Sequence, residues 1–360
     1  MSVLLRAALR RLRRWITTRQ RAKLVSRSGQ SRLGPSRQAA PYSNTETPRH
    51  AAAPVDVIYI AGHGRSGSTL LNVLLGHVKG VFAGSELWIT WQQGLENVDC
   101  ACGVDFSECE LWQGVFQEIS NGWEDGKARK IDSLRWPPYW IVAWLVRTHL
   151  LSRKLYRRQQ NWASELAQLY RGIQRTSGDA AIVDASKLTS NAVGLLSRKD
   201  VSLHVVHLVR DSRGTVYSLT KRGPWAGRTG SARAALSWTR ANLGPLSLRP
   251  FAASYTLLRY EDLVEDPNGS ITRILDKVPG LRAEVEIPGG EFAVERHHAI
   301  SGNRGVRSET TLEVRLDERW YRESPLKQKI VVTSLTWPLL LFFRYPLSPM
   351  RLSDQEKDPP

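Results

Sequence analysis

Residues 55–71 read VDVIYIAGHGRSGSTLL, and they carry the clearest sequence signal of the fold class. The apolar run 55–61 is typical of a buried parallel strand. A glycine-rich loop at 62–69 follows at once, and the leucine-rich residues 70–75 open a helix that ends near Gly76. A strand, a glycine-rich loop and a helix start present backbone N–H groups to a phosphate. The stretch predicts a phosphate-binding loop in an α/β fold, the alternative being a tight turn without a ligand.

The loop differs from the nucleotide-triphosphate pattern G-x-x-x-x-G-K-[ST] at one position that matters. Gly62 and Gly67 are in register, and Thr69 takes the hydroxyl position. Ser68 stands where that pattern has lysine, and the cation is Arg65, inside the loop. Without the lysine, charge on a β- or γ-phosphate is poorly held, so hydrolysis of ATP or GTP is disfavoured.

The GRSGSTLL segment, residues 64–71, resembles the 5′-phosphosulfate loop of sulfotransferases that use 3′-phosphoadenosine 5′-phosphosulfate (PAPS). The resemblance is to bacterial-type members. It implies a P-loop-like, three-layer α/β fold with a central parallel sheet of about five strands and a helical insertion. It also implies a set of nucleotide-binding residues in the loop: Arg65, Ser66, Gly67, Ser68, Thr69 and Leu70.

Four further apolar runs are predicted strands, and each is followed by polar or charged residues. They are 80–83, 181–184, 203–209 and 255–258. In an open parallel sheet, ligands bind beyond the carboxyl ends of the strands. Five strand ends of this kind therefore predict one common crevice.

Two later motifs resemble the nucleotide-binding parts of the same family. The segment 210–218 (RDSRGTVYS) is similar to the 3′-phosphate motif, which implies that Arg210 and Ser218 grip that phosphate. Arginine suits this role because its planar fork binds phosphate oxygens bidentately. Arg222 lies one helical turn beyond Ser218 and is a further candidate contact. The alternative is a helix cap with solvated arginines.

The segments 259–263 (RYEDL) and 298–303 (HAISGN) also resemble family elements. The first implies a nucleotide contact from Tyr260. The second is similar to a loop that closes over the nucleotide, which adds Ser301 and Arg307, although an arginine replaces the proline usual there.

Sulfuryl transfer needs a base for the acceptor's proton and cations for the developing charge. Glu86 is the predicted base, because its position after the second strand is similar to that of the catalytic glutamate in tyrosylprotein sulfotransferases; the alternative is a helix cap. Cytosolic sulfotransferases use histidine, which makes His63 and His77 the rivals. Arg65 and Lys187 are predicted to stabilise the sulfonate and the bridging oxygen, and no metal is required.

Three cysteines, Cys100, Cys102 and Cys109, form C-x-C-x₆-C, followed by Trp112. Three thiols could hold zinc with a fourth ligand, but no histidine is close in sequence. The favoured interpretation is a local structural element, and a metal site is the alternative.

The region 88–180 is predicted to be a helical insertion over the crevice. Residues 88–144 carry seven of the 13 tryptophans, which suits either an acceptor pocket or the core of a helical subdomain. The expected acceptor is a hydroxyl or an amine on a carbohydrate, a lipid-linked compound or another small molecule.

The charge of the chain is uneven. The 360 residues carry a net +17, of which +11 lies in residues 1–50. This distribution disfavours nucleic acid as a partner, because nucleic-acid-binding proteins spread basic residues over a folded face. The expected organisation is an arm at 1–54, a domain at 55–345 and a tail at 346–360. Within the arm, residues 3–16 fit a basic amphipathic helix that lies on an anionic membrane, the alternative being a solvated extension.

Three cysteines rule out a disulfide-dense scaffold, and no run of about 18 apolar residues predicts a spanning helix. The expected location is cytoplasmic, peripheral at the inner membrane surface. Residues 330–343 fit a buried helix and its exit, and the stretches 136–151 and 330–343 are candidates for a homodimer interface. The rival functions are a P-loop-type nucleotide kinase and a non-enzymatic membrane-surface adaptor that uses the arm.

Overall fold

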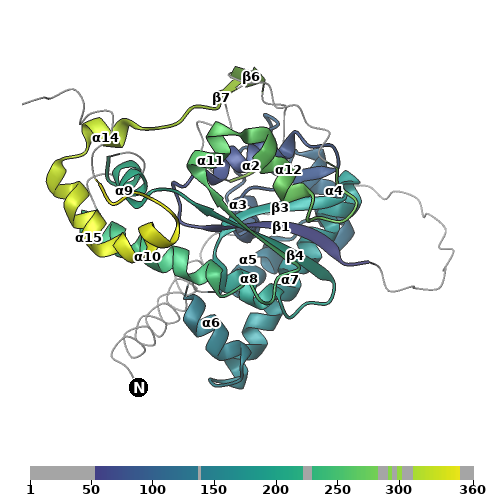
Figure 1. The fold of residues 1–360 in the computed structure, drawn as a ribbon. Coiled ribbons are helices and arrows are strands. Elements are labelled where there is room, and N and C mark those ends of the chain that lie inside the picture. Colours follow the sequence, from purple (N-terminus) through teal and green to yellow (C-terminus); the bar gives the residue numbers. More distant parts are fainter. Residues whose placement is uncertain are drawn as a thin grey trace, which may run out of the picture. The chain divides into compact units, whose positions relative to one another are not determined.

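The computed structural model describes residues 53–136, 139–221, 229–282, 291–293, 298–301 and 311–348 (Figure 1). The chain divides into two units, Met1–Pro54 and Val55–Pro360, and every element below belongs to the second. The predicted arm helix at 3–16, Arg222, Arg307 and residues 349–360 of the tail lie outside the described residues.

A parallel five-stranded sheet forms the centre of the second unit. Its strands are β1 (Val55–Gly62), β2 (Val81–Ala83), β3 (Ala181–Lys187), β4 (Val201–Val209) and β5 (Ser254–Arg259). The order across the sheet is β2-β3-β1-β4-β5, and every pairing is parallel. All five predicted strands are confirmed. Because β1 is central, the phosphate loop at its end lies in the middle of the sheet's carboxyl edge.

Helices connect the strands and fill the long interval between β2 and β3. They are η1 (Leu87–Ile89), α2 (Ser68–Gly76), α3 (Thr90–Leu95), α4 (Glu110–Ser120), α5 (Asp125–Asp132), α6 (Trp140–Arg147), α7 (Arg153–Ser177), α8 (Thr189–Leu195), α9 (Ser212–Lys221), α10 (Ser231–Leu246), α11 (Tyr260–Glu265), α12 (Pro267–Leu275), α14 (Arg319–Glu323) and α15 (Leu326–Phe342). Strands β6 (Glu291–Ala293) and β7 (Thr311–Glu313) form a separate antiparallel pair. Among the described helices, none has both the length and the apolarity needed to cross a membrane.

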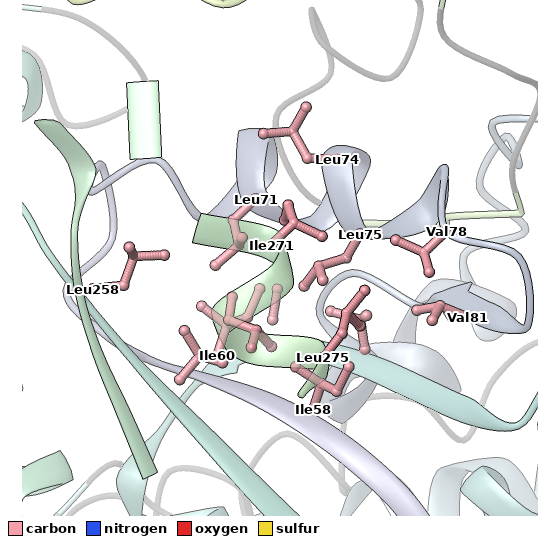
Figure 2. Close-up of a cluster of buried hydrophobic side chains, with 14 of the residues drawn as sticks. Ile58, Ile60, Leu71, Leu74, Leu75, Val78, Val81, Leu258, Ile271 and Leu275 are labelled. Carbon is pink, nitrogen blue, oxygen red and sulfur yellow. The ribbon is translucent and has the colours of Figure 1, made fainter. Parts of the chain in front are cut away.

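The sheet is covered on both faces, as the predicted three-layer fold requires (Figure 1). Helices α2, α11 and α12 pack on one face, and α7, α8 and α10 pack on the other. Alternation along β1 sends Ile58 and Ile60 toward the first face. There they meet Leu71 and Leu75 of α2 and Ile271 of α12 in one buried cluster (Figure 2). This cluster fixes α2, and with it the phosphate loop, against the sheet.

The helix expected at 330–343 is present as α15 but is not buried as expected. Val332 and Leu340 are buried, whereas Ile330, Trp337 and Phe342 are each more than half exposed. The prediction of burial was wrong because the segment is apolar on all sides, and its sequence does not indicate which face packs. Helix α15 therefore presents an apolar face to solvent.

Candidate active site

The loop after β1 has a backbone that admits little else than glycine at two positions. Gly62 has φ 139°, and a Cβ there would lie 2.3 Å from the carbonyl oxygen of Leu208. Gly67 has φ 91°, and a Cβ there would lie 2.5 Å from the ring of Tyr260. No side chain of the described residues caps α2, whose first N–H groups consequently face the loop. The Ser66 hydroxyl is buried without a hydrogen-bond partner among those residues, as suits a loop built for an anion.

Left-handed backbone recurs at the carboxyl ends of three neighbouring strands. Arg65 follows β1 with φ 68°, Ser85 follows β2 with φ 59°, and Lys187 ends β3 with φ 64°. Strand β3 also holds one extra residue against β1, because Tyr59 pairs with Asp184 but Ala61 pairs with Lys187. Such bulges and strained residues often re-aim side chains at functional sites.

The arginines of the phosphate loop and of β4 lie close together. The Nε of Arg65 donates to the hydroxyl of Ser218 on α9 at 3.0 Å. Arg210 follows β4 and is buried, with one Nη donating to the carbonyl of Asp317 at 2.8 Å. Its guanidinium also lies over the ring of Tyr260, with 4.5 Å to the centroid. Residues from four segments thus form one cationic corner, which consists of Arg65, Arg210, Ser218, Tyr260 and Asp317.

Asp317 balances the charge of this corner. Its carboxylate lies 3.4 Å from Arg210 and 2.6 Å from Arg319. Burial by itself would raise the pKa of Asp317, but the Arg319 hydrogen bond and the Arg210 charge lower it to about 2. Asp317 is therefore ionised at neutral pH and holds Arg210 in place.

Arg213, the second arginine of the 210–218 segment, is a structural residue. It is buried, forms an ion pair with Asp211 at 2.6 Å and lies over the ring of Trp320. It also donates to the carbonyls of Pro346 and Ser348 at 2.7 Å. Neither arginine of the segment is solvated, and Arg213 fastens the chain that follows α15.

Glu86 and Lys187 form an ion pair at the ends of β2 and β3. Lys187 Nζ lies 2.7 Å from Glu86 Oε1, with 16% of the lysine side chain and 26% of the glutamate side chain exposed. The same Nζ donates to the carbonyl of Ala185. The backbone N–H of Glu86 donates to Ser301 Oγ at 2.8 Å, and Ser85 Oγ donates to the carbonyl of Ser301 at 2.9 Å. Ser301 thus lies against the backbone of Glu86, the predicted base.

The buried carboxylate of Asp184 orders the end of β3 that carries Lys187. Asp184 accepts hydrogen bonds from Tyr170 at 2.6 Å and from the backbone N–H of Ser186 at 2.8 Å. Burial raises the pKa of Asp184 to about 6, against the lowering effect of these hydrogen bonds. Ser186 in turn accepts from the backbone N–H of Trp88 at 3.3 Å. Asp184 therefore fixes the bulged end of β3, from which Lys187 projects.

A pocket of about 260 Å³ opens beside the phosphate loop. Its charged lining residues are Glu86, Lys187 and Arg240, and its aromatic lining residues are Trp88 and Trp140. The predicted base, Glu86, thus faces the same space as two cations and two residues of the tryptophan-rich region. A pocket with this lining can hold an acceptor next to the Glu86 carboxylate.

His63 also lines this pocket, but its nitrogens are engaged. Nδ1 lies 2.6 Å from the carbonyl of Gly64 and so carries the proton, which leaves Nε2 to accept from Ser237 Oγ at 3.3 Å. Burial lowers the pKa of His63 to about 4. His77, the other rival base, hydrogen-bonds the carbonyl of Val73 in its own helix and is not a lining residue of the pocket.

Sequence reasoning missed three residues of the site: Ser237, Arg240 and Asp317. Ser237 and Arg240 are three positions apart on α10, so they share a helix face. A polar stripe on an otherwise alanine-rich helix was the available signal. Asp317 carries no motif, and its role comes only from its place beside Arg210.

A family model described as "Sulfotransferase family" matches residues 56–282. A comparison with curated proteins finds no significant match.

Three solved structures resemble this chain at low sequence identity, and the first of them shares its fold. The sulfotransferase domain of the olefin synthase from Synechococcus PCC 7002 is 20% identical with a TM-score of 0.50, covering 85% of this chain and 100% of that one. The sulfotransferase domain from the curacin biosynthetic pathway is 18% identical with a TM-score of 0.46, covering 82% and 100%. A sulfotransferase from Mycobacterium tuberculosis H37Rv is 18% identical with a TM-score of 0.36, covering 63% and 68%.

Proposed function

The chain belongs to the sulfotransferase family, and on this premise we propose that Glu86, Arg65 and Lys187 transfer a sulfuryl group to an acceptor hydroxyl or amine. Family membership makes the chain a PAPS-dependent sulfotransferase. The observation that carries the assignment of roles is the Glu86–Lys187 pair, 2.7 Å apart at a pocket beside the phosphate loop.

The residues at the carboxyl edge of the sheet suit PAPS. The 5′ side would lie against the first turn of α2, where uncapped N–H groups and the unpartnered Ser66 hydroxyl favour an anion. The 3′-phosphate would lie against Arg210, which is buried at the end of β4, and Ser218 of α9. Tyr260 packs on the loop and on Arg210, so it can order both parts of the nucleotide site.

PAPS would supply the sulfuryl group: the acceptor atom bonds to its sulfur as the bond from that sulfur to the 5′-phosphate oxygen breaks, and 3′-phosphoadenosine 5′-phosphate leaves. The chain supplies the proton acceptor and the cations. One carboxylate oxygen of Glu86 takes the proton of the acceptor's hydroxyl, since Glu86 lines the pocket with part of its side chain exposed. Lys187 Nζ and the Arg65 guanidinium stabilise the negative charge that develops beside them. His63 is a poor alternative base. Its unprotonated nitrogen, Nε2, already accepts from Ser237 Oγ, and burial lowers the pKa of His63 to about 4.

The acceptor pocket favours one ring or the end of a larger molecule. Its volume of about 260 Å³ is near the lower limit of ligand sites, which run from about 300 to 1,000 Å³. Trp88 and Trp140 offer flat apolar faces, and Arg240 offers a cation. We therefore propose a carbohydrate, a lipid-linked compound or another small molecule that presents a hydroxyl or an amine.

Two proposals concern the enzyme's surroundings. The basic segment 3–16 would place it at an anionic membrane surface. A homodimer would use the apolar stretches named above, which is supported by the exposure of Ile141, Leu150 and Trp337.

A thermal-shift panel with 3′-phosphoadenosine 5′-phosphate (PAP), ADP and GDP tests the nucleotide assignment. A ligand at 100 times its Kd stabilises the folded state by about 2.7 kcal/mol. We expect PAP to raise the Tm and ADP and GDP to leave it unchanged, because they lack the 3′-phosphate that Arg210 would bind. Equal stabilisation by ADP would instead favour a nucleotide kinase.

A further inference from the structure

All three cysteines of the chain converge on one histidine that is distant in sequence. Cys109 Sγ lies 3.2 Å from His298 Nδ1, and Cys100 Sγ lies 3.9 Å from the same atom. Cys102 Sγ lies 3.7 Å from Cys109 Sγ. The four ligand atoms all lie within 4.8 Å of one another. The fold thus provides the fourth ligand that the neighbourhood of the C-x-C-x₆-C segment lacks.

These separations match a tetrahedral zinc site. Zinc binds thiolate sulfur at about 2.3 Å and imidazole nitrogen at about 2.0–2.1 Å, and a tetrahedron with those bonds has S···S near 3.8 Å and S···N near 3.5 Å. Three sulfurs and one nitrogen are a ligand set typical of structural zinc, with no position left for a substrate. Cys100 and Cys109 are buried, as suits a closed site.

The backbone around the cluster is already ordered by hydrogen bonds that do not involve the sulfur and ring-nitrogen atoms of the cluster. Asp99 and Asp105 form an isolated antiparallel bridge, and the N–H of Cys100 donates to the carbonyl of Val104 at 2.8 Å. Across the cluster, the Trp112 indole donates to the carbonyl of His298 at 3.0 Å. A site pre-shaped in this way loses little entropy when a metal binds.

We propose that Cys100, Cys102, Cys109 and His298 bind one structural Zn²⁺ ion. The ion joins the segment after β2 to the 298–301 segment, which are distant in the sequence. This inference does not rest on the proposed transfer reaction, since the four residues lie outside the pocket of Glu86 and Lys187.

The site has a consequence for the active centre. Ala101 N–H donates to the carbonyl of Ala299 at 2.9 Å. Two residues later, the carbonyl of Ser301 accepts from the Ser85 hydroxyl, and Ser301 Oγ accepts from the backbone N–H of Glu86. The zinc therefore fixes the segment that positions the Glu86 backbone. Loss of the metal is expected to loosen this segment without removing any residue of the pocket.

Elemental analysis of the purified full-length chain tests the proposal. The protein is expressed with added zinc and purified without chelator, and we expect about one zinc per chain. Cys102→Ser and His298→Ala are each expected to lower the zinc content at least fivefold. His149→Asn is the matched control, because His149 is an exposed histidine with φ 59°, a conformation that asparagine tolerates.

Reconstitution keeps the test valid if the variants fail to fold. Wild-type protein is stripped with a chelator under reducing conditions and titrated with Co²⁺, and we expect visible bands of tetrahedral thiolate-bound cobalt that saturate at one equivalent. Because the chain has only three cysteines, the reaction of native protein with a thiol reagent reports on this cluster alone. Thiols protected until the chelator is added support the site. Absence of zinc, iron in its place, or a Cys102–Cys109 disulfide in the freshly purified protein would overturn the proposal.

Discussion

Replacement of Glu86 by glutamine removes the predicted base while keeping its shape. The amide oxygen of Glu86→Gln can still accept from Lys187 Nζ, which also donates to the carbonyl of Ala185. The ion pair is partly exposed, with 26% of the glutamate side chain accessible, so its loss costs at most about 1 kcal/mol of folding stability. A general base contributes about 10²–10⁴ in rate, or about 2.7–5.4 kcal/mol of activation free energy. Catalysis is therefore expected to suffer far more than folding.

The assay follows transfer of radiolabelled sulfate from PAPS into an extract that contains acceptors, together with PAP release. We expect Glu86→Gln to lose 100-fold or more in kcat. PAP should bind no more weakly than to the wild type, because removal of the Glu86 carboxylate leaves Lys187 less neutralised. Glu118→Gln is the matched control. It breaks an ion pair with Arg175, 3.5 Å apart on α4 and α7, among residues that do not line the pocket.

Retention of more than a tenth of the wild-type kcat by Glu86→Gln would refute the role of Glu86 as base. His63→Asn then becomes the informative variant, because His63 is the other proton acceptor that lines the pocket. With Glu86 as the base, His63→Asn keeps most of the activity. If only His63→Asn loses activity, the His63 imidazole is the base instead of Glu86.

Four further predictions concern the nucleotide, stability and location. Arg210→Ala is expected to weaken PAP about 10- to 100-fold by calorimetry and adenosine 5′-phosphosulfate hardly at all, since only PAP carries the 3′-phosphate; equal losses would contradict the assignment. The pKa of Asp184 is raised to about 6 from an ordinary value of 3.8, so its ionisation lowers stability as the pH rises through that range, by about 3 kcal/mol in total. Urea unfolding from pH 4 to 7 should show this fall in the unfolding free energy of the wild type relative to Asp184→Asn. If the unfolding free energies of the two proteins change in parallel with pH, the prediction is wrong. Gly67→Ala should lower the Tm and PAP affinity because its Cβ would meet a ring at 2.5 Å, whereas Gly64→Ala has nothing within 4 Å and should be neutral in thermal shift. Deletion of residues 1–50 should abolish partitioning onto anionic vesicles while activity persists, and unchanged partitioning would reject membrane contact through the arm.

The strands were predictable because each is a short apolar run bounded by polar residues. Buried parallel strands read in this way since both of their faces lie under helices. That Glu86, Lys187 and Arg210 follow strands at the same edge of the sheet could be predicted, because the carboxyl ends of parallel strands share one edge. Predictions failed where a side chain's surroundings depend on distant segments. The buried face of α15 and the place of Asp317 beside Arg210 have no local signature.

His298 shows the same limit in its sharpest form. Its partner Cys109 is 189 positions away, so spacing within the C-x-C-x₆-C segment could not indicate a fourth ligand. Compact zinc knuckles take all their ligands from one short segment, so their spacing indicates only a nearby histidine. Here the ligands come from two segments that the fold brings together, which only tertiary structure can reveal.

The strained residues at the crevice indicate what the rigid sheet supports. Arg65, Ser85 and Lys187 each hold a left-handed backbone that costs on the order of 1 kcal/mol or more. Such strain persists only where the surroundings over-determine the conformation. Each residue has such surroundings: Arg65 bonds Ser218, Ser85 bonds the carbonyl of Ser301, and Lys187 bonds Glu86. Relaxed backbone at these positions would disturb the contact of Arg65 with Ser218 and that of Lys187 with Glu86. The strain is therefore best explained as the cost of holding these side chains at the carboxyl edge of the sheet.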